Sequence, residues 1–405
     1  MRYVVVGGGI AGVTVAEELR ERDPGAEVVL FDGEPGPLYS RMLLKEYLKG
    51  AVDEEELAIH DAAWFERRGI DRRAGVRVTG TEGGAALTDR GGREPYDVLF
   101  ATAGGAQVDP FGVLGEAENA FGLWTLEEAR RVRELAGSDA VERAVVVGAG
   151  FLGLELADAL ATRGVPTDFV MRGHWSRHGL GRAGAEIVHD ALEAHGVTVR
   201  DGRSVEGFER EAGRVTAVRT DRGALPCDLL GLAVGLASSA GYLEGTGAEV
   251  RDGAVVDERM RSDDPAVFAA GDVAEYRDVV LGRHRRTGTW IDAIDQARVA
   301  AATATGADAR FEKVEAHSVA VGGLDAPVVF LGDWDGGDEA VERRRGDTRY
   351  RRVAFREGRP VGATLIGESG DVSGQLKRLI LDGPVLDDAG RASLLDLHLD
   401  RGRTP

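Results

Sequence analysis

YVVVGGGIAG, residues 3–12, places an apolar run directly before three glycines, Gly7, Gly9 and Gly12, in Gly-x-Gly-x-x-Gly spacing. The run predicts a buried parallel strand, and a helical pattern follows to about residue 22. In such a loop the first glycine makes the tight turn, the second lets the backbone approach a pyrophosphate, and the third lets helix and strand pack closely. The helix N-terminus also attracts phosphate. The stretch therefore predicts a dinucleotide-binding βαβ unit.

The end of the next strand supplies an acid. Residues 28–31 form a second apolar run, and Asp32 follows 20 residues after Gly12, with Glu34 close behind. An acid at this position accepts a hydrogen bond from a ribose hydroxyl. The spacing leaves open which of the two does so.

The pattern restarts at residues 144–153, AVVVGAGFLG, with Gly148, Gly150 and Gly153 in the same spacing. A helix is predicted over 153–163 and a strand over 167–170. Two dinucleotide loops in one chain indicate that electrons pass between two bound nucleotides.

The residues after the strand at 167–170 bear on the choice of nicotinamide. No acid stands at Met171, and Arg172, His174 and Arg177 follow it. Arginine suits bidentate recognition of a 2′-phosphate, so the pattern slightly favours NADPH. The alternative is a solvated basic turn in an enzyme that uses NADH.

We predict an α/β fold with two Rossmann-like dinucleotide-binding domains. The family resemblance given below implies that the NAD(P) domain is inserted in a split FAD domain. Further strands are expected at 97–101, 228–234 and 266–269, with a helix at 291–303. After residue 312 short strand-like runs indicate a small C-terminal α+β domain. The predicted boundaries are 1–117 and 248–311 for the FAD domain, 118–247 for the NAD(P) domain, 312–386 for the C-terminal domain and 387–405 for a tail.

The composition restricts the kinds of partner that the chain can bind. The chain has 405 residues and a formal net charge of −19, which disfavours nucleic acid and anionic membranes. No apolar run is long enough to span a bilayer, and the only cysteine is Cys227, so we expect a cytoplasmic protein without disulfides. Only four of the 50 cationic residues are lysines, which indicates either salt adaptation or an acidic drift in a GC-rich genome. No metal-binding pattern is expected, although His174 and His178 have i, i+4 spacing.

Three further segments carry a family resemblance: Tyr39 to Leu44, the run 267–272 ending in Gly271-Asp272, and Thr289-Trp290 through Gln296. The chain resembles the FAD-dependent pyridine nucleotide oxidoreductases, within them the rubredoxin and ferredoxin reductases, the flavin part of nitrite reductase and apoptosis-inducing factor. The resemblance implies that Arg41 contacts FAD, that Asp272 binds the ribityl chain and that Trp290 lies beside the isoalloxazine. Thr102 belongs to an Ala-Thr-Gly motif that reads Ala-Thr-Ala-Gly here.

Two departures from the family concern the cofactor segments. Gly33 stands where many members carry the ribose acid, so Asp32 or Glu34 must substitute for it. Ala297 stands where glycine is common.

The resemblance also implies a catalytic pair. Glu155 matches a glutamate near the contact between flavin and nicotinamide, where many members pair it with a lysine. By spacing from Arg41 that lysine would fall at Glu46, so a shift of one residue is needed for Lys45 to pair with Glu155. The alternative is that Lys45 is a surface lysine.

Together these features imply an enzyme that binds FAD, accepts hydride from NAD(P)H and passes electrons to a ferredoxin or rubredoxin. In the family, members that reduce disulfides or peroxides need a thiol next to the flavin. We expect Cys227, the only thiol, to be a semi-buried structural residue just before a predicted strand, so disulfide reduction is not expected. An oxidase that uses oxygen and a flavin-bearing redox sensor or scaffold with slow turnover remain alternatives. The basic segment 283–286 is either a docking patch for an acidic carrier or a solvated loop.

Overall fold

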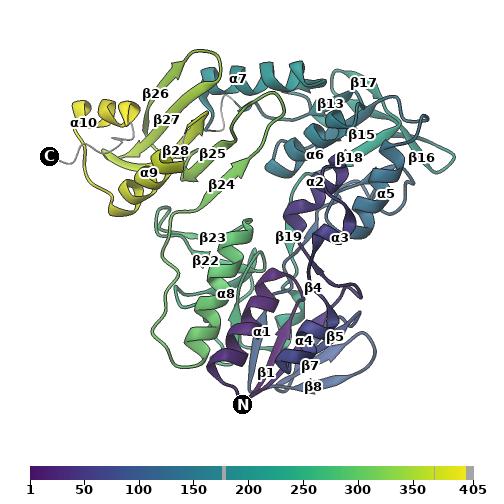
Figure 1. Cartoon of the computed structure of the whole chain (residues 1–405), viewed down its shortest axis with the longest axis vertical. Helices are drawn as coiled ribbons and strands as arrows, with labels where there is room; N and C mark the ends of the chain where they lie inside the picture. The colour runs from purple at the N-terminus through teal and green to yellow at the C-terminus, as the bar shows by residue number, and fades with distance from the viewer. Residues whose placement is uncertain (176–178, 369, 398–405) are drawn as a thin grey trace. The chain divides into compact units, whose positions relative to one another are not determined.

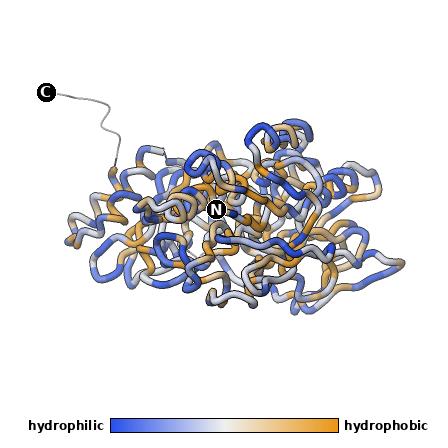
Figure 2. The backbone as a smooth tube through the Cα atoms, turned by 90° about the horizontal axis from the view of Figure 1, so that it is seen from below, coloured by the Kyte–Doolittle hydropathy of each residue, from blue (hydrophilic) through white to orange (hydrophobic). Residues whose placement is uncertain are grey.

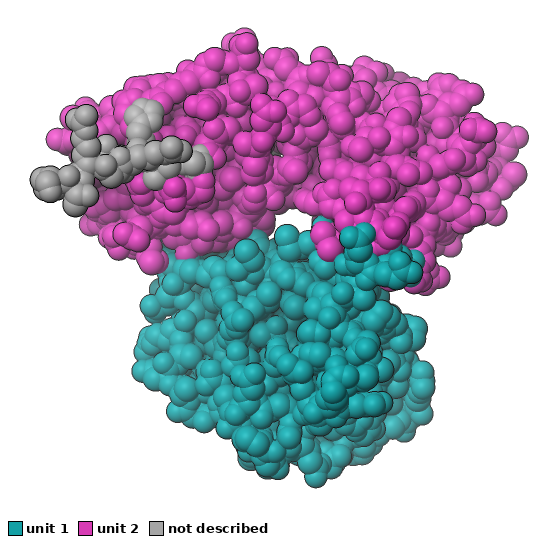
Figure 3. All heavy atoms as spheres, in the orientation of Figure 1, with its two compact units in different colours: residues 1–42, 54–106, 236–313 teal, residues 43–53, 107–235, 314–405 magenta. Residues whose placement is uncertain are grey.

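The computed structural model describes residues 1–175, 179–368 and 370–397. The chain forms two compact units, coloured separately in Figure 3. Unit 1 comprises residues 1–42, 54–106 and 236–313, and unit 2 comprises residues 43–53, 107–235 and 314–405. Each unit is built from segments that are far apart in the sequence, as expected when one nucleotide-binding domain is inserted in another.

Unit 1 is centred on a parallel sheet whose strand order is β21-β9-β1-β2-β5. The strands are β1 (Arg2–Val6), β2 (Glu27–Asp32), β5 (Asp71–Ala74), β9 (Val98–Ala101) and β21 (Val267–Ala269). β1 lies in the middle, and its valines are buried, which is why its sequence is an uninterrupted apolar run. The helices α1 (Ile10–Arg22) and α8 (Trp290–Ala304) pack side by side (Figure 1).

Smaller elements complete unit 1. They are β3 (Leu38–Tyr39), α3 (Glu54–Leu57), β4 (Ala58–His60), α4 (Ala62–Arg68), β6 (Val78–Glu82), β7 (Ala85–Thr88), β8 (Arg93–Pro95), β19 (Leu236–Ser238), η3 (Gly241–Gly245), β20 (Ala254–Val256), β22 (Ala274–Arg277) and β23 (His284–Arg286). Two further short elements, η1 (Arg41–Leu43) and β10 (Gly105–Gln107), lie where the chain passes from one unit to the other.

Unit 2 contains a second parallel sheet, in the order β11-β18-β12-β13-β14. Its strands are β11 (Ala120–Phe121), β12 (Ala144–Val147), β13 (Thr167–Val170), β14 (Val197–Arg200) and β18 (Leu229–Leu232). The helices of this part are α2 (Leu44–Lys49), α5 (Leu126–Ala136), α6 (Phe151–Thr162) and α7 (Gly181–Ala194). An antiparallel sheet of β15 (Val205–Glu211), β16 (Arg214–Thr220) and β17 (Gly223–Pro226) adjoins them in sequence.

The C-terminal part of unit 2 is an antiparallel sheet in the order β24-β25-β28-β27-β26. The strands are β24 (Ala316–Val319), β25 (Val328–Gly332), β26 (Glu339–Arg345), β27 (Arg349–Arg356) and β28 (Arg359–Ile366), followed by α9 (Gly370–Asp382), α10 (Asp388–Ser393) and η4 (Leu394–Asp396). Arg351 is 2% exposed and donates to the carbonyls of Leu394 and Leu397, which ties η4 to the sheet. The predicted fold class, two parallel nucleotide-binding sheets and a small α+β part, is confirmed.

Hydrophilic and hydrophobic segments alternate along the described part of the backbone (Figure 2). In the described part of the chain, no helix combines the length and the apolar character that crossing a bilayer requires.

The third glycine of each fingerprint is required by packing. A Cβ on Gly12 would overlap the carbonyl oxygen of Gly7 and lie 2.7 Å from the Thr102 hydroxyl. Likewise, a Cβ on Gly153 would overlap the carbonyl oxygen of Gly148. The helix and the loop before it approach each other so closely in both units that only glycine fits.

We expect Gly12→Ala to destabilise the apoprotein by about 2 kcal/mol or more, because the new methyl group forces the loop and α1 apart. The matched control is Gly374→Ala in α9, where a Cβ would meet no atom within 4 Å and the substitution should gain up to about 1 kcal/mol. Urea unfolding followed by circular dichroism measures both variants. Equal stability of the two would contradict the packing argument.

Candidate functional site

The first loop has the form that a pyrophosphate requires. Gly7 has a φ of +117°, a value that L-residues with a side chain rarely adopt. A Cβ on Gly9 would meet no atom within 4 Å, whereas one on Gly7 would overlap the Thr102 carbonyl. The backbone at Gly9 therefore faces open space at the N-terminus of α1, where helix N–H groups attract phosphate.

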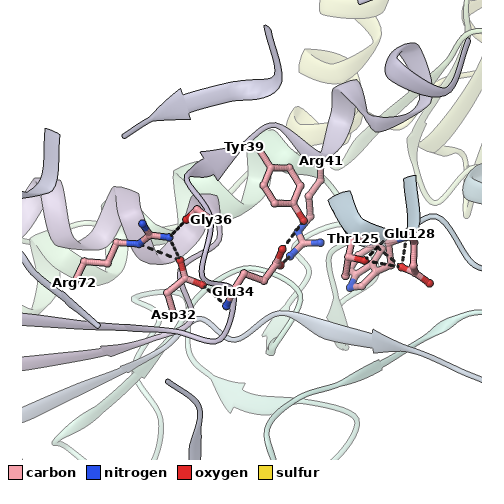
Figure 4. Close-up of polar contacts among 9 residues, drawn as sticks. Asp32, Glu34, Gly36, Tyr39, Arg41, Arg72, Thr125 and Glu128 are labelled. Carbon is pink, nitrogen blue, oxygen red and sulfur yellow. Dashed lines mark hydrogen bonds and ion pairs between the residues drawn. The ribbon is translucent and has the colours of Figure 1, made fainter. Parts of the chain in front are cut away.

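Asp32 ends β2 and is engaged within the protein. Its carboxylate accepts hydrogen bonds from the Arg72 guanidinium at 2.5 Å and from the Glu34 N–H at 3.0 Å (Figure 4). It lies directly against Gly8, where a Cβ would overlap the carboxylate. Only 7% of Asp32 is exposed, so its carboxylate supports the glycine loop from inside the protein.

Glu34 is the more accessible of the two acids. Its side chain is 32% exposed and forms an ion pair with Arg41. It also accepts a hydrogen bond of 2.8 Å from the Tyr39 hydroxyl (Figure 4). The structure thus places Glu34 and Arg41, both candidates from the sequence, in one polar cluster.

Thr102 lies beneath the same loop. It is 4% exposed, and its hydroxyl is 3.0 Å from the Val6 carbonyl and 3.1 Å from the Gly7 carbonyl. This geometry makes Thr102 a support for the glycine turn.

The Gly271-Asp272 turn is held by a residue that the sequence analysis did not single out as a site residue. Gln296 of α8 is fully buried, and its side-chain oxygen accepts from the Gly271 N–H at 2.9 Å. Its amide nitrogen has no partner among the described residues. Burial raises the pKa of Asp272 to about 6, although the charges of Arg286 and Arg41 act in the opposite direction.

Trp290 begins α8. The helix is capped by the Thr289 side chain, which accepts from the Asp292 N–H at 3.0 Å. Asp292 is buried and is neutralised by Lys313 at 2.6 Å. These contacts fix the start of the helix and with it the backbone of Trp290.

The second loop repeats the first in unit 2. Gly148 has a φ of +130°, and a Cβ on Gly150 would meet no atom within 4 Å. The backbone again faces open space at the N-terminus of a helix, here α6. In both loops the first glycine has a positive φ, the second faces open space and the third lies against the carbonyl of the first.

Lys45 and Glu155 form an ion pair, the first from α2 and the second from α6. Their side chains are 18% and 21% exposed. The structure therefore brings together the two residues for which the sequence left pairing open.

Basic side chains gather after β13. Met171 is buried and Arg172 is exposed, while His174 lies 2.7 Å from Asp201. A Cβ on the adjacent Gly202 would lie 2.9 Å from the His174 ring and 3.6 Å from a guanidinium nitrogen of Arg222. No motif pointed to Arg222, which lies in the turn between β16 and β17. The remaining candidate, Arg177, lies outside the described residues.

The segment 283–286 is less of a surface patch than its sequence indicates. Arg285 lies 3.6 Å from the buried Asp278, and Arg286 donates to the Leu236 carbonyl at 2.7 Å. In this segment Arg283 alone is exposed, and His284, Arg285 and Arg286 are partly buried. Two of the three arginines therefore make contacts inside unit 1.

Thiol chemistry has no support in the structure. Cys227 is 3% exposed, and burial raises its pKa to about 12. The thiol therefore stays protonated at neutral pH and is a poor nucleophile. Within residues 1–175, 179–368 and 370–397, no group of three or more His, Cys, Asp or Glu side chains is arranged to hold a metal ion.

Comparisons with known proteins agree with this architecture. The family model described as pyridine nucleotide-disulphide oxidoreductase matches residues 1–303. The ferredoxin–NAD(+) reductase component of the anthranilate 1,2-dioxygenase system of Burkholderia cepacia is 32% identical, with 95% of each chain covered. Rhodocoxin reductase of Rhodococcus erythropolis is 30% identical over 78% of this chain and 74% of its own. Among solved structures, the covalent putidaredoxin reductase–putidaredoxin complex matches with a TM-score of 0.87 at 25% identity, covering 98% of each chain.

We expect the Asp272 carboxyl to destabilise the flavin-free protein as the pH rises from about 4 to about 7. Its pKa is higher in the folded state (about 6) than its ordinary value of 3.8, so the folded protein holds the proton longer and loses stability on releasing it. Asp272→Asn should therefore have a higher Tm than the parent above pH ~7 and the same Tm near pH ~4, measured by scanning calorimetry. Asp263→Asn, an exposed acid of unit 1, is the control. A Tm difference that does not change with pH would refute the assignment.

Proposed function

The chain belongs to the pyridine nucleotide-disulphide oxidoreductase family, and on this premise we propose that it oxidises NAD(P)H and passes the electrons to a small one-electron carrier protein, a ferredoxin or rubredoxin. The observation that carries the proposal is the pair of fingerprint loops, each with its second glycine facing open space at a helix N-terminus. FAD, when bound, supplies a two-electron acceptor that can release electrons singly.

We assign the binding of FAD to unit 1. The loop at Gly7, Gly9 and Gly12 would take the pyrophosphate. Glu34 would accept from the ribose, because Asp32 is nearly buried and is already engaged by Arg72. This choice resolves the alternative that spacing left open.

The flavin end of the cofactor would meet other residues of unit 1. Asp272 would accept from the ribityl chain, with Gly271 holding its turn, and Arg41 and Trp290 would contact the flavin portion. The raised pKa of Asp272 supports this role, because a carboxyl shielded from water gains from a ligand hydroxyl that donates to it.

We assign the nicotinamide dinucleotide to unit 2, where the loop at Gly148, Gly150 and Gly153 would take its pyrophosphate. Glu155 begins the second turn of α6. There a carboxylate can accept from the carboxamide of the nicotinamide. Lys45 restricts the Glu155 rotamer through the ion pair, so the pair would orient the donor for hydride transfer.

The state of the single cysteine supports a carrier as the electron acceptor. Members of the family that reduce disulfides need a thiol next to the flavin, and Cys227, the only cysteine, is buried and protonated. The relatives include ferredoxin, putidaredoxin and rhodocoxin reductases. Because NAD(P)H delivers two electrons, each turnover would reduce two one-electron carriers. We place this reaction in the cytoplasm, where a chain with one cysteine needs no oxidising environment.

The exposed Arg172 supports a preference for NADPH. It lies just after β13, where an acid would repel a 2′-phosphate, and His174 and Arg222 both approach Gly202. Arg177 stays a further candidate for contact with that phosphate.

The experiment that tests the function is anaerobic stopped-flow of the FAD-loaded protein with NADPH and, separately, NADH. We expect the flavin band near ~450 nm to bleach rapidly and to return when oxidised ferredoxin or rubredoxin is added. Equally fast return with oxygen alone would make the protein an oxidase. A flavin that neither donor bleaches, or a long-lived charge-transfer complex, would refute the reductase in favour of a sensor or scaffold.

Arg172→Ala should lower kcat/KM for NADPH about 10-fold, since a charge-assisted contact to phosphate contributes roughly 1.5 kcal/mol, and should leave kcat/KM for NADH within about twofold. Steady-state kinetics with each donor measures the effect. Arg182→Ala removes a cation from α7 whose side chain is 88% exposed, and it serves as the control. Equal losses for both donors would show that Arg172 does not read the 2′-phosphate.

A further inference from the structure

A second ion pair links α2 to α6, one helical turn beyond the pair of Lys45 and Glu155. The Lys49 ammonium lies 2.8 Å from the Asp158 carboxylate. Lys45 and Lys49 are four residues apart on α2, and their partners Glu155 and Asp158 are three residues apart on α6. Residues at these spacings share a helix face, so the two ion pairs form consecutive rungs between the helices.

The Asp158 rung is the more deeply buried. The Asp158 side chain is 2% exposed, against 21% for Glu155. Asp158 also accepts from the Gly322 N–H at 2.6 Å and lies 3.6 Å from His195 at the end of α7. A buried carboxylate with three partners is a fixed point, because a displacement would leave its charge buried without them.

The helix α2 needs such a fixed point. It has only six residues, too few to be stable through its own hydrogen bonds. Its apolar side chains, Leu44, Tyr47 and Leu48, are buried, but apolar packing does not direct a lysine head group. Burial lowers the pKa of Lys49, yet Asp158, Glu46 and Glu155 more than offset this and raise it overall, so the cation is present throughout the neutral range.

We infer that Lys49 and Asp158 are positioning residues, which hold α2 against α6 so that Lys45 stays paired with Glu155. The inference rests on the proposed function, since it assigns to this rung the alignment of the residues proposed to orient the nicotinamide. Neither residue needs to touch a nucleotide for this role.

The test uses the full chain carrying Lys49→Met together with Asp158→Asn. Asparagine retains the carbonyl oxygen that accepts from Gly322, and the double change leaves no unpaired buried charge. Lys377→Met on α9 is the control, and Lys45→Met shows the effect of losing the first rung itself. If the double variant does not fold, Lys49→Gln alone takes its place.

The first measurement needs no cofactor. In the flavin-free protein we expect amide hydrogen exchange over residues 44–50 to be at least about 10-fold faster in the double variant than in the Lys377→Met control, with the rest of the chain unchanged. Exchange over 44–50 that matches the control would overturn the inference, whether or not the proposed function is correct.

The second measurement is stopped-flow with saturating NAD(P)H. The limiting rate of flavin bleaching should fall about 10-fold or more in the double variant, towards the value for Lys45→Met, while the dissociation constant for NAD(P)H stays within about twofold. Lys49→Arg, which keeps the charge, should recover most of the rate. A loss that appears in the dissociation constant instead of the limiting rate would overturn the positioning role. If the wild-type flavin itself does not bleach, the proposed function fails, and the exchange measurement still decides whether the rung holds α2.

Discussion

The nucleotide-facing parts of this chain depend on one steric constraint. In each unit the carbonyl oxygen of the first loop glycine occupies the place that a Cβ of the third glycine would need, at Gly7 with Gly12 and at Gly148 with Gly153. The constraint fixes where each helix starts relative to the strand before it. Because the helix cannot shift outward, its first N–H groups converge at one place, and the second glycine leaves that place open. The two loops lie in different units with different neighbouring residues, yet both have the geometry that suits a phosphate at a helix N-terminus.

The parts of the fold that are predictable from sequence are those buried on both faces. β12 coincides with the apolar run at 144–147 and β1 contains the run at 3–6, because a parallel strand covered by helices has no polar side. β26 is different: its sequence is EAVERRR, and it pairs on one side only, at the edge of the C-terminal sheet. Its arginines Arg343 and Arg345 pair with Asp396 more than 50 residues away, so charge pairing contributes to its place at the sheet edge. No local sequence pattern predicts an edge strand that is rich in charged residues, as β26 is.

The candidate site shows the same division. Motif spacing pointed to the glycines and to Asp32 or Glu34 on a βαβ unit, whereas the pairing of Lys45 with Glu155 required a shift of one residue from the spacing of the family. Spacing could not show that Asp32 is engaged by Arg72, 40 residues further on, or that Arg286 turns towards Leu236 and Asp272. Those contacts depend on which side chains from other strands reach the same end of the sheet. The sequence analysis ranked residues by motif, whereas burial decides which of two similar acids remains accessible.

The lysines reveal a last constraint. Arginine supplies nearly all the positive charge, yet Lys45, Lys49 and Lys313 each meet a carboxylate on a helix that begins at or beside a predicted nucleotide contact. Lys313 lies 2.6 Å from both Asp292 and Asp295, and Lys49 reaches a carboxylate that is almost fully buried. A compact ammonium can donate in three directions from one atom, whereas a guanidinium is planar and needs more space in a fixed orientation. Exposed pairs such as Arg182 with Glu186 make no such demand. Three of the four lysines therefore place a compact charge between packed elements, and two of these three lie within the six residues of α2.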